Sequence, residues 1–273
     1  MIQIALQQMS IIAQPRLTPE QVKALEHATG LAGARLALAL LPQARQLSLA
    51  PVSNFAVGAI AMADSGYWYL GANLEFAGLA LHYSVHAEQS AIGHAALHNE
   101  QHIQAVVVSA SPCGHCRQFM QELNQPVTIT LPEAEHALSE LLPYAFGPAD
   151  LGIDGGMLSP EPGTLHHASD DTLLKAALQQ ANLSYAPYSH NRAGVALQLA
   201  DGRIITGRYL ENAAFNPGLG PMQLALSQLQ LQGGQPEHIT RAVLVESAAG
   251  ISQYPGAAQL LAASSAVTLE HVS

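Results

Sequence analysis

The sequence reads HAEQSA at residues 86–91 and SPCGHCRQF at residues 111–119, and these two segments carry its most specific chemistry. They supply one imidazole, from His86, and two thiols, from Cys113 and Cys116. This ligand set suits Zn²⁺, and three protein ligands leave the fourth tetrahedral position open, as catalytic zinc sites require. Glu88 stands near enough to that position to move protons to and from a water molecule there. The pattern therefore predicts a catalytic zinc site with Glu88 as its general acid and base.

The cysteine pair by itself has other interpretations. A C-x-x-C spacing also occurs in redox pairs and in structural zinc sites. Cys113 and Cys116 are the only cysteines of the chain, which excludes a four-cysteine site within one chain. A redox pair would not account for the histidine and glutamate upstream. The catalytic zinc site therefore explains more of the sequence than either alternative.

Helices and strands are expected to alternate around these motifs, which predicts an α/β fold. The alanine-rich residues 86–97 are typical of a buried helix, and a second helix is expected from about 113 to 123. Both zinc-binding motifs would then lie at helix N-termini, where the helix dipole favours thiolates. Short strands are expected at 55–62, 67–72, 105–109 and 127–131.

The N-terminal part is predicted to be helical from Thr18 to about Leu47, with a break at Pro42. Residues 1–15 lack a basic region before an apolar core, so no secretory signal is expected. The longest apolar run, 30–41, is short and contains Arg35, so no membrane span is expected.

The second half of the chain repeats the plan of the first. LSLAPVS at residues 47–53 aligns with LSYAPYS at residues 183–189, an offset of 136 residues. The same offset pairs Gly58 with Gly194 and Gly71 with Gly207, and a small gap brings residues 105–106 to 242–243. This indicates an internal duplication. The second copy has Gly220 for His86, Met222 for Glu88 and no cysteine, so one zinc ion per chain is expected, in the first copy.

Four parts are expected along the chain. They are an N-terminal helical segment (1–46), a catalytic zinc domain (47–142), a linker rich in Gly, Pro, Asp and Ser (143–171), and a zinc-free copy of the catalytic domain (172–273).

Composition narrows the function further. Hydrophobic residues make up 49% and charged residues 11% of the chain, which favours a large buried core over disorder. The formal net charge is −10 and the ten Lys and Arg residues form no cluster, so no nucleic-acid partner is expected. Reduced cysteines that serve as metal ligands are typical of a cytoplasmic protein.

Five residues near the motifs have weaker signals. His94, His98 and the later His102 recur at helical spacing, but no glutamate follows His98 to form H-E-x-x-H, so a solvated polar face is expected. His115 is expected to be a bystander, because two thiolates compete better for the ion. Arg117 is expected either to donate to a cysteine thiolate or to lie on the surface.

Taken together, the motifs resemble the bacterial cytidine deaminases of the two-domain, homodimeric kind, in which a zinc-free copy follows the catalytic one. H-x-E followed by P-C-x-x-C is the general signature of zinc deaminases, and the similarity covers nearly the whole chain. The resemblance implies duplicated α/β/α domains, each with a mixed central sheet, and one Zn²⁺ per chain. It also implies hydrolytic deamination of cytidine and 2′-deoxycytidine to uridine and 2′-deoxyuridine, with release of ammonia.

The resemblance further implies roles for residues that the motifs alone do not identify. Phe55 is expected to pack near the nucleoside, Asn73 and Glu75 to hold ribose hydroxyls, the backbone at Ala87 and Ser111 to read the pyrimidine edge, and Phe146 to cover the pyrimidine from the neighbouring subunit. Ala110 departs from the family pattern, which has an aromatic residue at this position.

Two other classes of protein share part of this pattern. A deaminase that acts on cytosine in a polynucleotide has the same zinc motif, but it must hold a phosphate backbone, which the acidic composition disfavours. A non-catalytic zinc protein would have no use for Glu88.

Overall fold

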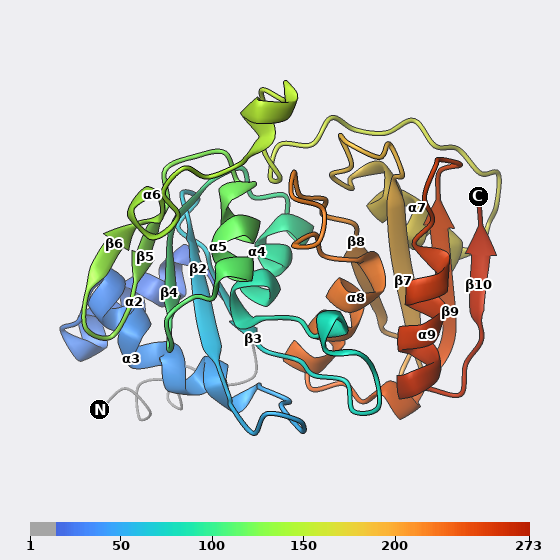
Figure 1. The fold of residues 1–273 in the computed structure, drawn as a ribbon. Helices are drawn as coiled ribbons and strands as arrows, with labels where there is room; N and C mark the ends of the chain where they lie inside the picture. The colour runs from blue at the N-terminus through green and yellow to red at the C-terminus, as the bar shows by residue number, and fades with distance from the viewer. Residues whose placement is uncertain (1–14) are drawn as a thin grey trace.

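The structure, a computed structural model, describes residues 15–273. The expectation that no secretory signal is present therefore rests almost entirely on residues outside the described range. Figure 1 shows two α/β halves side by side, with α4 (Ala87–Leu97) of the first half packed against α8 (Pro221–Leu231) of the second. Among the helices of residues 15–273, none combines the length and the apolar character needed to cross a bilayer.

The first half is built on a six-stranded sheet in the order β1-β3-β2-β4-β5-β6. β2 pairs antiparallel with β3 and β4, whereas β4 pairs parallel with β5, so the sheet is mixed. Its elements are β1 (Arg16–Leu17), α2 (Pro19–Thr29), α3 (Gly33–Gln46), β2 (Gly58–Ala63), β3 (Trp68–Ala72), η2 (Leu81–Tyr83), α4, β4 (Ile103–Val108), α5 (Gly114–Gln121), β5 (Thr128–Thr130), β6 (Glu135–Ala137), α6 (Leu138–Leu141) and η3 (Pro148–Leu151).

The second half has a four-stranded sheet in the order β10-β9-β7-β8. β7 pairs antiparallel with β8 and β9, and β9 pairs parallel with β10, which repeats the pairing of β2 to β5. The predicted duplication and mixed sheets are therefore confirmed. Its elements are α7 (Thr172–Asn182), β7 (Ala193–Leu199), β8 (Ile204–Arg208), α8, η4 (Pro236–His238), β9 (Ile239–Glu246), α9 (Tyr254–Ser264) and β10 (Leu269–Val272).

Each sheet lies between helices, as the predicted α/β/α architecture requires. On the first sheet, Ile60 and Val107 face α2 and α3, while the neighbouring Ala61 and Val106 face the core shared with α4 and α5. This alternation follows from the two-residue period of a strand that is buried on both faces.

Two equivalent glycines let a helix lie directly against each sheet. A Cβ on Gly71 would lie 2.2 Å from the backbone nitrogen of Ala91 in α4, and a Cβ on Gly207 would lie 2.1 Å from the carbonyl oxygen of Pro221 in α8. Only glycine fits such an approach. The two glycines that align in the sequence therefore have the same role in both copies, which is to allow close contact between helix and sheet.

The structure corrects two details of the sequence interpretation. Ala61 pairs with Val106, and its equivalent Leu197 pairs with Ala242, so the alignment of residues 105–106 with 242–243 is wrong by one residue. The break predicted at Pro42 is also wrong, because Pro42 lies inside α3 and the chain turns at Gly30 (φ 70°) instead. Buried residues on both sides of Pro42 pack α3 onto the first sheet, and this packing outweighs the lost hydrogen bond.

Part of the predicted linker is buried rather than exposed. The segment crosses from the first half to the far edge of the second (Figure 1). Met157 and Leu158 are 1% and 4% exposed and join the core cluster that contains residues of both copies. The backbone N–H of Met157 donates to the carbonyl of Glu122 (2.9 Å). The linker therefore fills part of the space between the two halves.

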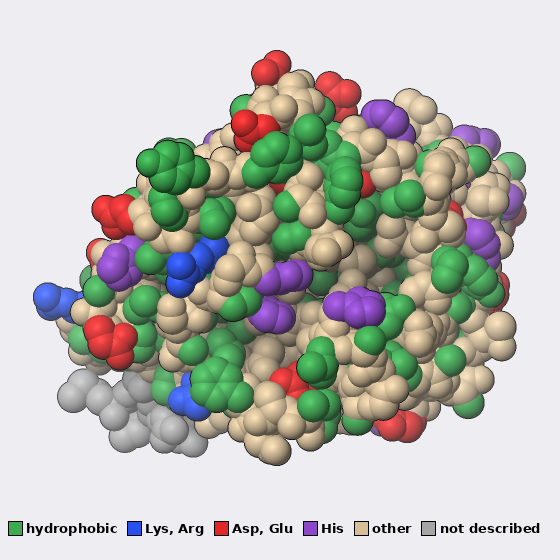
Figure 2. Space-filling view, in the orientation of Figure 1, with side chains coloured by type: hydrophobic (Ala, Val, Ile, Leu, Met, Phe, Trp, Pro, Cys, Tyr) green, Lys and Arg blue, Asp and Glu red, His purple; other side chains and the backbone are tan. Residues whose placement is uncertain are grey.

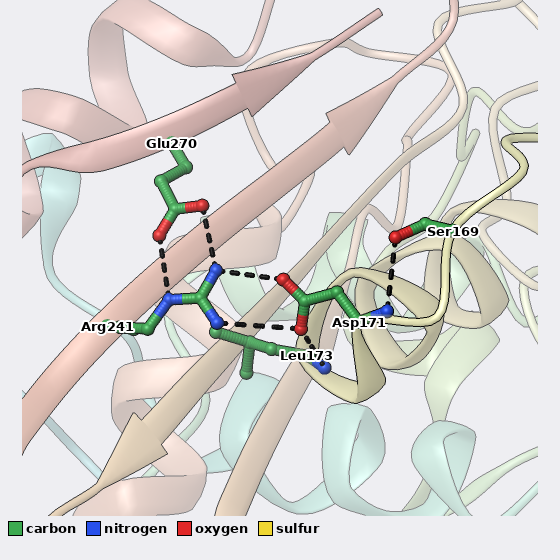
Figure 3. Close-up of polar contacts among 5 residues, drawn as sticks. All are labelled: Ser169, Asp171, Leu173, Arg241 and Glu270. Atoms are coloured by element: carbon green, nitrogen blue, oxygen red, sulfur yellow. Dashed lines mark hydrogen bonds and ion pairs between the residues drawn. The ribbon is translucent and has the colours of Figure 1, made fainter.

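Beyond this segment, an arginine of the second sheet holds the start of α7 (Figure 3). Asp171 caps α7 by accepting from Leu173 N (2.9 Å) and also accepts from Arg241 Nη2 (2.8 Å). Arg241 donates to both carboxylate oxygens of Glu270 on β10, at 3.0 and 2.9 Å. This cluster ties α7, β9 and β10 together at the surface.

Candidate active site

The three predicted zinc ligands converge at the N-termini of two helices. His86 precedes α4 and Cys113 precedes α5, while Cys116 lies in the first turn of α5. The His86 Nδ1 atom is 3.4 Å from Cys113 Sγ and 3.2 Å from Cys116 Sγ, and the two sulfurs are 3.7 Å apart. Tetrahedral zinc with ordinary bond lengths places two sulfurs about 3.8 Å apart and a nitrogen about 3.6 Å from each sulfur. The spacing of the donor atoms and their chemistry therefore fit a zinc ion.

Within residues 15–273 this is the one group of His, Cys, Asp and Glu side chains with metal-binding geometry. Hydrogen bonds from Cys116 and His86 lower the pKa of Cys113 to about 3, so this side chain is a thiolate at neutral pH. The N-terminus of α5 also favours the negative charge. A thiolate is the form of cysteine that binds metal.

Glu88 lies in the first turn of α4 and lines the same cavity as the ligands. The residue is 4% exposed, and this burial raises the pKa of its carboxyl group. A raised pKa makes a carboxyl group a better proton carrier near neutral pH. The structure thus brings the Glu88 carboxyl group to the same cavity as the three ligands.

The cavity has a volume of about 400 Å³, within the range of small-molecule sites. Figure 2 shows several histidine side chains gathered at the centre of one face of the molecule. Nine of the ten predicted site residues meet at this cavity: Phe55, Asn73, Glu75, His86, Ala87, Glu88, Ser111 and Cys113 line it, and Cys116 is buried beside its fellow ligands. Ala110 lines the cavity as well. Phe146 does not line it and is 45% exposed.

Glu75 is held in one orientation by the loop before β2. Its Oε2 accepts from the backbone N–H groups of Val52 and Ser53, both at 2.9 Å, and its Oε1 accepts from the Ser53 hydroxyl (2.5 Å). Burial alone raises the pKa of Glu75, but these hydrogen bonds outweigh it and the net pKa is lowered. Because two donors occupy Oε2, the free acceptor site lies on Oε1.

Asn73 is fixed in a similar way. Its Oδ1 accepts from Ser48 Oγ (2.6 Å) and Val57 N (2.8 Å), and its Nδ2 donates to the Phe55 carbonyl (3.0 Å). One N–H of Asn73 is left. Together with the free acceptor of Glu75, this makes one donor and one acceptor, which is the complement of one hydroxyl group.

Sequence reasoning missed the serines that orient these two residues. Ser48 and Ser53 both lie in the segment LSLAPVS, which revealed the duplication but was assigned no role in the site. Leu81 and Ser84 of the cavity wall were also missed. Nothing in the local sequence of these two residues marks them, because the loop that carries them reaches the cavity only in the folded chain.

The weaker sequence signals have mixed outcomes. The expected solvated face is wrong for His94, which is 3% exposed and donates from Nδ1 to the Leu70 carbonyl (3.2 Å), because α4 is enclosed by the sheet and α8. Arg117 donates to the carbonyls of Pro112 (2.8 Å) and Leu141 (2.9 Å), so it braces the cysteine loop and takes neither predicted role. His115 stacks near His86, with ring centroids 5.2 Å apart, and stays outside the ligand group.

Comparison with known proteins agrees with this site. Residues 34–131 and 138–258 each match a family described as "Cytidine and deoxycytidylate deaminase zinc-binding region". Proteins named cytidine deaminase from Aeromonas hydrophila and Shewanella amazonensis are 53% and 52% identical to the chain. Each alignment covers 94% of this chain, and 89% and 88% of the two relatives respectively.

A crystal structure of cytidine deaminase from Mycobacterium tuberculosis is 28% identical, with a TM-score of 0.38, over 41% of this chain and 95% of that one. The two family matches together span most of the chain, and the identity to the two curated relatives extends over almost its full length. The chain therefore belongs to the zinc-binding cytidine deaminase family.

Proposed function

We propose that this protein converts cytidine and 2′-deoxycytidine to uridine and 2′-deoxyuridine by hydrolytic deamination. The observation that carries the proposal is the convergence of the His86, Cys113 and Cys116 ligand group with Glu88 at one cavity that also holds the Asn73 and Glu75 side chains. A proton carrier, a zinc site and a hydroxyl-binding pair are the parts that this reaction needs.

Glu88 performs the proton transfers in the proposed mechanism. Bound zinc supplies Lewis acidity, which makes water acidic enough to act as a nucleophile near neutral pH. The Glu88 carboxylate accepts a proton from the attacking water and passes it to N3 of the cytosine ring, which makes C4 electrophilic. After the hydroxyl has added at C4, Glu88 accepts the proton of that hydroxyl and delivers it to the departing amine. Ammonia leaves, and the ring becomes uracil.

The remaining predicted residues hold the substrate. We propose that Phe55 packs against the nucleoside, that backbone groups at Ala87 and Ser111 bind the pyrimidine edge, and that Asn73 and Glu75 share one ribose hydroxyl. One hydroxyl is enough to saturate their free donor and acceptor, which supports acceptance of both the ribo- and the deoxyribonucleoside. Free cytosine would leave both groups unpaired, so the nucleoside is preferred.

We propose that the active form is a homodimer in which Phe146 closes the cavity of the partner subunit. In support, Phe146 is 45% exposed, and within the same short stretch of chain Tyr144 is fully exposed and Leu151 is 44% exposed. Apolar side chains that gather at a surface are typical of an interface. Sedimentation and activity measured over one dilution series test this, and a fully active monomer would contradict it.

We also propose the four-part division of the chain that the sequence predicts, at 1–46, 47–142, 143–171 and 172–273, with α3 of the first part covering one face of the catalytic sheet. The close packing of α3 supports this cover: a Cβ on Gly58 would lie 2.6 Å from the backbone nitrogen of Arg45. A cytoplasmic location is proposed because the two cysteines act as reduced metal ligands.

The rival function is deamination of cytosine in a polynucleotide. No Lys or Arg lines the cavity among the described residues, whereas Glu75 and Glu88 do, and Lys and Arg are sparse on the face shown in Figure 2. A phosphate backbone would therefore meet no positive charge. The test follows the absorbance of cytidine, cytidine monophosphate and a single-stranded oligonucleotide with zinc-loaded protein. Turnover of the oligonucleotide at the rate of cytidine would overturn the proposal.

A further inference from the structure

The zinc-binding helix α5 is held at its far end by the zinc-free copy. Glu122, which ends α5, has no exposed surface. Its carboxylate accepts from the Tyr185 hydroxyl (2.8 Å), from the backbone N–H of Ala213 (2.8 Å) and from the Tyr188 hydroxyl. All three donors belong to the second copy. A carboxylate of the catalytic copy is therefore buried within its zinc-free neighbour.

A second contact lies one helical turn closer to the cysteines. Gln118 donates through Nε2 to Asn212 Oδ1 (3.4 Å) and to the Phe146 carbonyl (2.7 Å), and Asn212 Nδ2 donates back to the Gln118 carbonyl (3.0 Å). Residues 118 and 122 are one turn apart, so they share a face of the helix. The opposite face, with Cys116 and Phe119, packs into the core of the first copy.

The duplication shows that this arrangement is not a general property of the fold. Tyr185 and Tyr188 stand where the first copy has Leu49 and Val52, which are 51% and 49% exposed. Around Leu49 an open groove of about 550 Å³ extends to residues 263–264 at the end of α9. Helix α9 contains no acidic residue that could play the part of Glu122. The buried carboxylate with its two tyrosine donors therefore occurs at α5, which carries zinc ligands, and not at its equivalent α9, which carries none.

We propose that the zinc-free copy positions α5 through Glu122, Tyr185 and Tyr188, and that it thereby sets how firmly the site holds zinc. Helix α5 has eight residues, too few for a helix to be stable without tertiary contacts. A shift of its far end moves the Cys113 and Cys116 sulfurs relative to His86. Groups that orient metal ligands change metal affinity about 10- to 100-fold when they are lost.

The proposal rests on the zinc site and not on the reaction catalysed there. Zinc-loaded full-length protein is mixed with an excess of a coloured chelator, and the rate of zinc transfer is followed. The double variant Tyr185→Phe/Tyr188→Phe keeps both rings and removes both hydroxyls, and we expect it to release zinc about tenfold faster than the unmodified protein. Glu122→Gln, which removes the charge at the other end of the same contacts, is expected to do the same.

Tyr209→Phe is the matched control. It removes a buried hydroxyl of the same copy that donates to Glu211 (3.4 Å) and, among the described residues, makes no hydrogen bond to α5, so its zinc release is expected to stay within about twofold of the unmodified protein. Thermal unfolding of each variant is measured alongside. Unchanged release in the tyrosine double variant, or equal acceleration in Tyr209→Phe, would overturn the inference. Protein that shows the expected release but no turnover of cytidine would instead contradict the proposed function alone.

Discussion

The two copies have the same hydrogen-bonded frame around very different sites. Isolated bridges join Leu74 to Leu49 and to Val85 in the first copy, and Leu210 joins Tyr185 and Leu219 in the same way in the second. Glu211, the equivalent of Glu75, still accepts from the backbone N–H groups of residues 188 (2.8 Å) and 189 (3.2 Å). The frame has persisted where the zinc ligands have not, so it does not depend on the metal.

The second copy has also filled the space that serves as a cavity in the first. The strand pairing aligns Val108 with Leu244, so Glu246 is the equivalent of Ala110. Glu246 is 4% exposed. It accepts from Gln253 N (2.7 Å) and Asn191 Nδ2 (3.3 Å), and Asn191 is the equivalent of Phe55. Loss of function in this copy therefore includes loss of the substrate space as well as loss of the ligands.

The largest expected effect tests whether the metal is confined to the first copy. Cys113→Ala removes one of three ligands, and we expect zinc content to fall from one ion per chain to nearly none and deamination to become undetectable. Metal analysis with a parallel cytidine assay checks both. Two zinc ions per unmodified chain would show that the second copy binds metal after all.

The next largest effect is expected from substitution of Glu88, whose equivalent in the second copy is Met222. Glu88→Gln is expected to keep zinc and to lower turnover by about 10²- to 10⁴-fold, because the amide cannot carry the protons. Met222→Leu is the matched control in the zinc-free copy and should leave turnover unchanged. Retention of more than about a tenth of the original rate by Glu88→Gln would remove this residue from the mechanism.

Substitution of the two glycines that contact α4 and α8 is expected to have a smaller effect, of similar size in both copies. Gly71→Ala and Gly207→Ala each force a Cβ against helix backbone, so each should lower the free energy of unfolding by about 1–3 kcal/mol or more. Urea denaturation measures this. Gly71→Ala should also lower zinc content, because α4 carries His86 at its start. Gly250→Ala, where a Cβ meets nothing within 4 Å, is the control.

His94 makes the stability of the first copy depend on pH. Burial lowers its pKa from the ordinary 6.5 to about 3, so below pH 6.5 the unfolded chain binds a proton that the folded chain does not. Stability is therefore full above pH 6.5 and falls as the pH falls toward 3. From about pH 7.5 to about pH 5.5 the loss from this residue is about 1.4 kcal/mol.

The second copy supplies the matched variant for this test. Its equivalent of His94 is Gln228, which is equally buried and cannot titrate. Urea denaturation of His94→Gln at both pH values should show the smaller pH dependence. If the unmodified protein and His94→Gln lose the same free energy of unfolding between the two pH values, other groups cause the acid sensitivity.

The smallest expected effect concerns the surface cluster of Asp171, Arg241 and Glu270, which the first copy lacks. Because the side chains of its members are 33–48% exposed, Arg241→Gln should lower the melting temperature by less than about 3 °C, and this difference should shrink further at high salt. Thermal unfolding at two ionic strengths measures it. A large, salt-independent decrease would show that the cluster organises the start of α7.

Most of the frame and the centre of the site could be predicted from the sequence. Zinc ligation leaves a strict pattern of residue types, and the glycines at 71 and 207 mark close approaches that tolerate no side chain. The one-residue error in aligning β4 with β9 has a physical cause. Residues 105–108 of β4 and 242–245 of β9 are continuous apolar runs, so either register would bury similar side chains, and only the pairing partners on β2 and β7 decide between them.

Features that depend on tertiary packing could not be read from local sequence. Pro42 is compatible with α3 only because the sheet holds the helix on both sides of it. His94 looked like part of a polar face because nothing near it in sequence announces α8, which encloses it. The hydroxyls of Ser48 and Ser53 gain their roles only when the loop before β2 meets Asn73 and Glu75.

The buried middle of the linker has a consequence for how the molecule comes apart. Met157 and Leu158 lie in a core to which both copies contribute, and Gln89 of α4 and Gln223 of α8 each donate to the backbone of the other copy, at 3.1 and 3.0 Å. Separating the halves would expose this core and break both hydrogen bonds at once. We therefore expect heat or denaturant to unfold both halves together, with no intermediate in which one half stays folded.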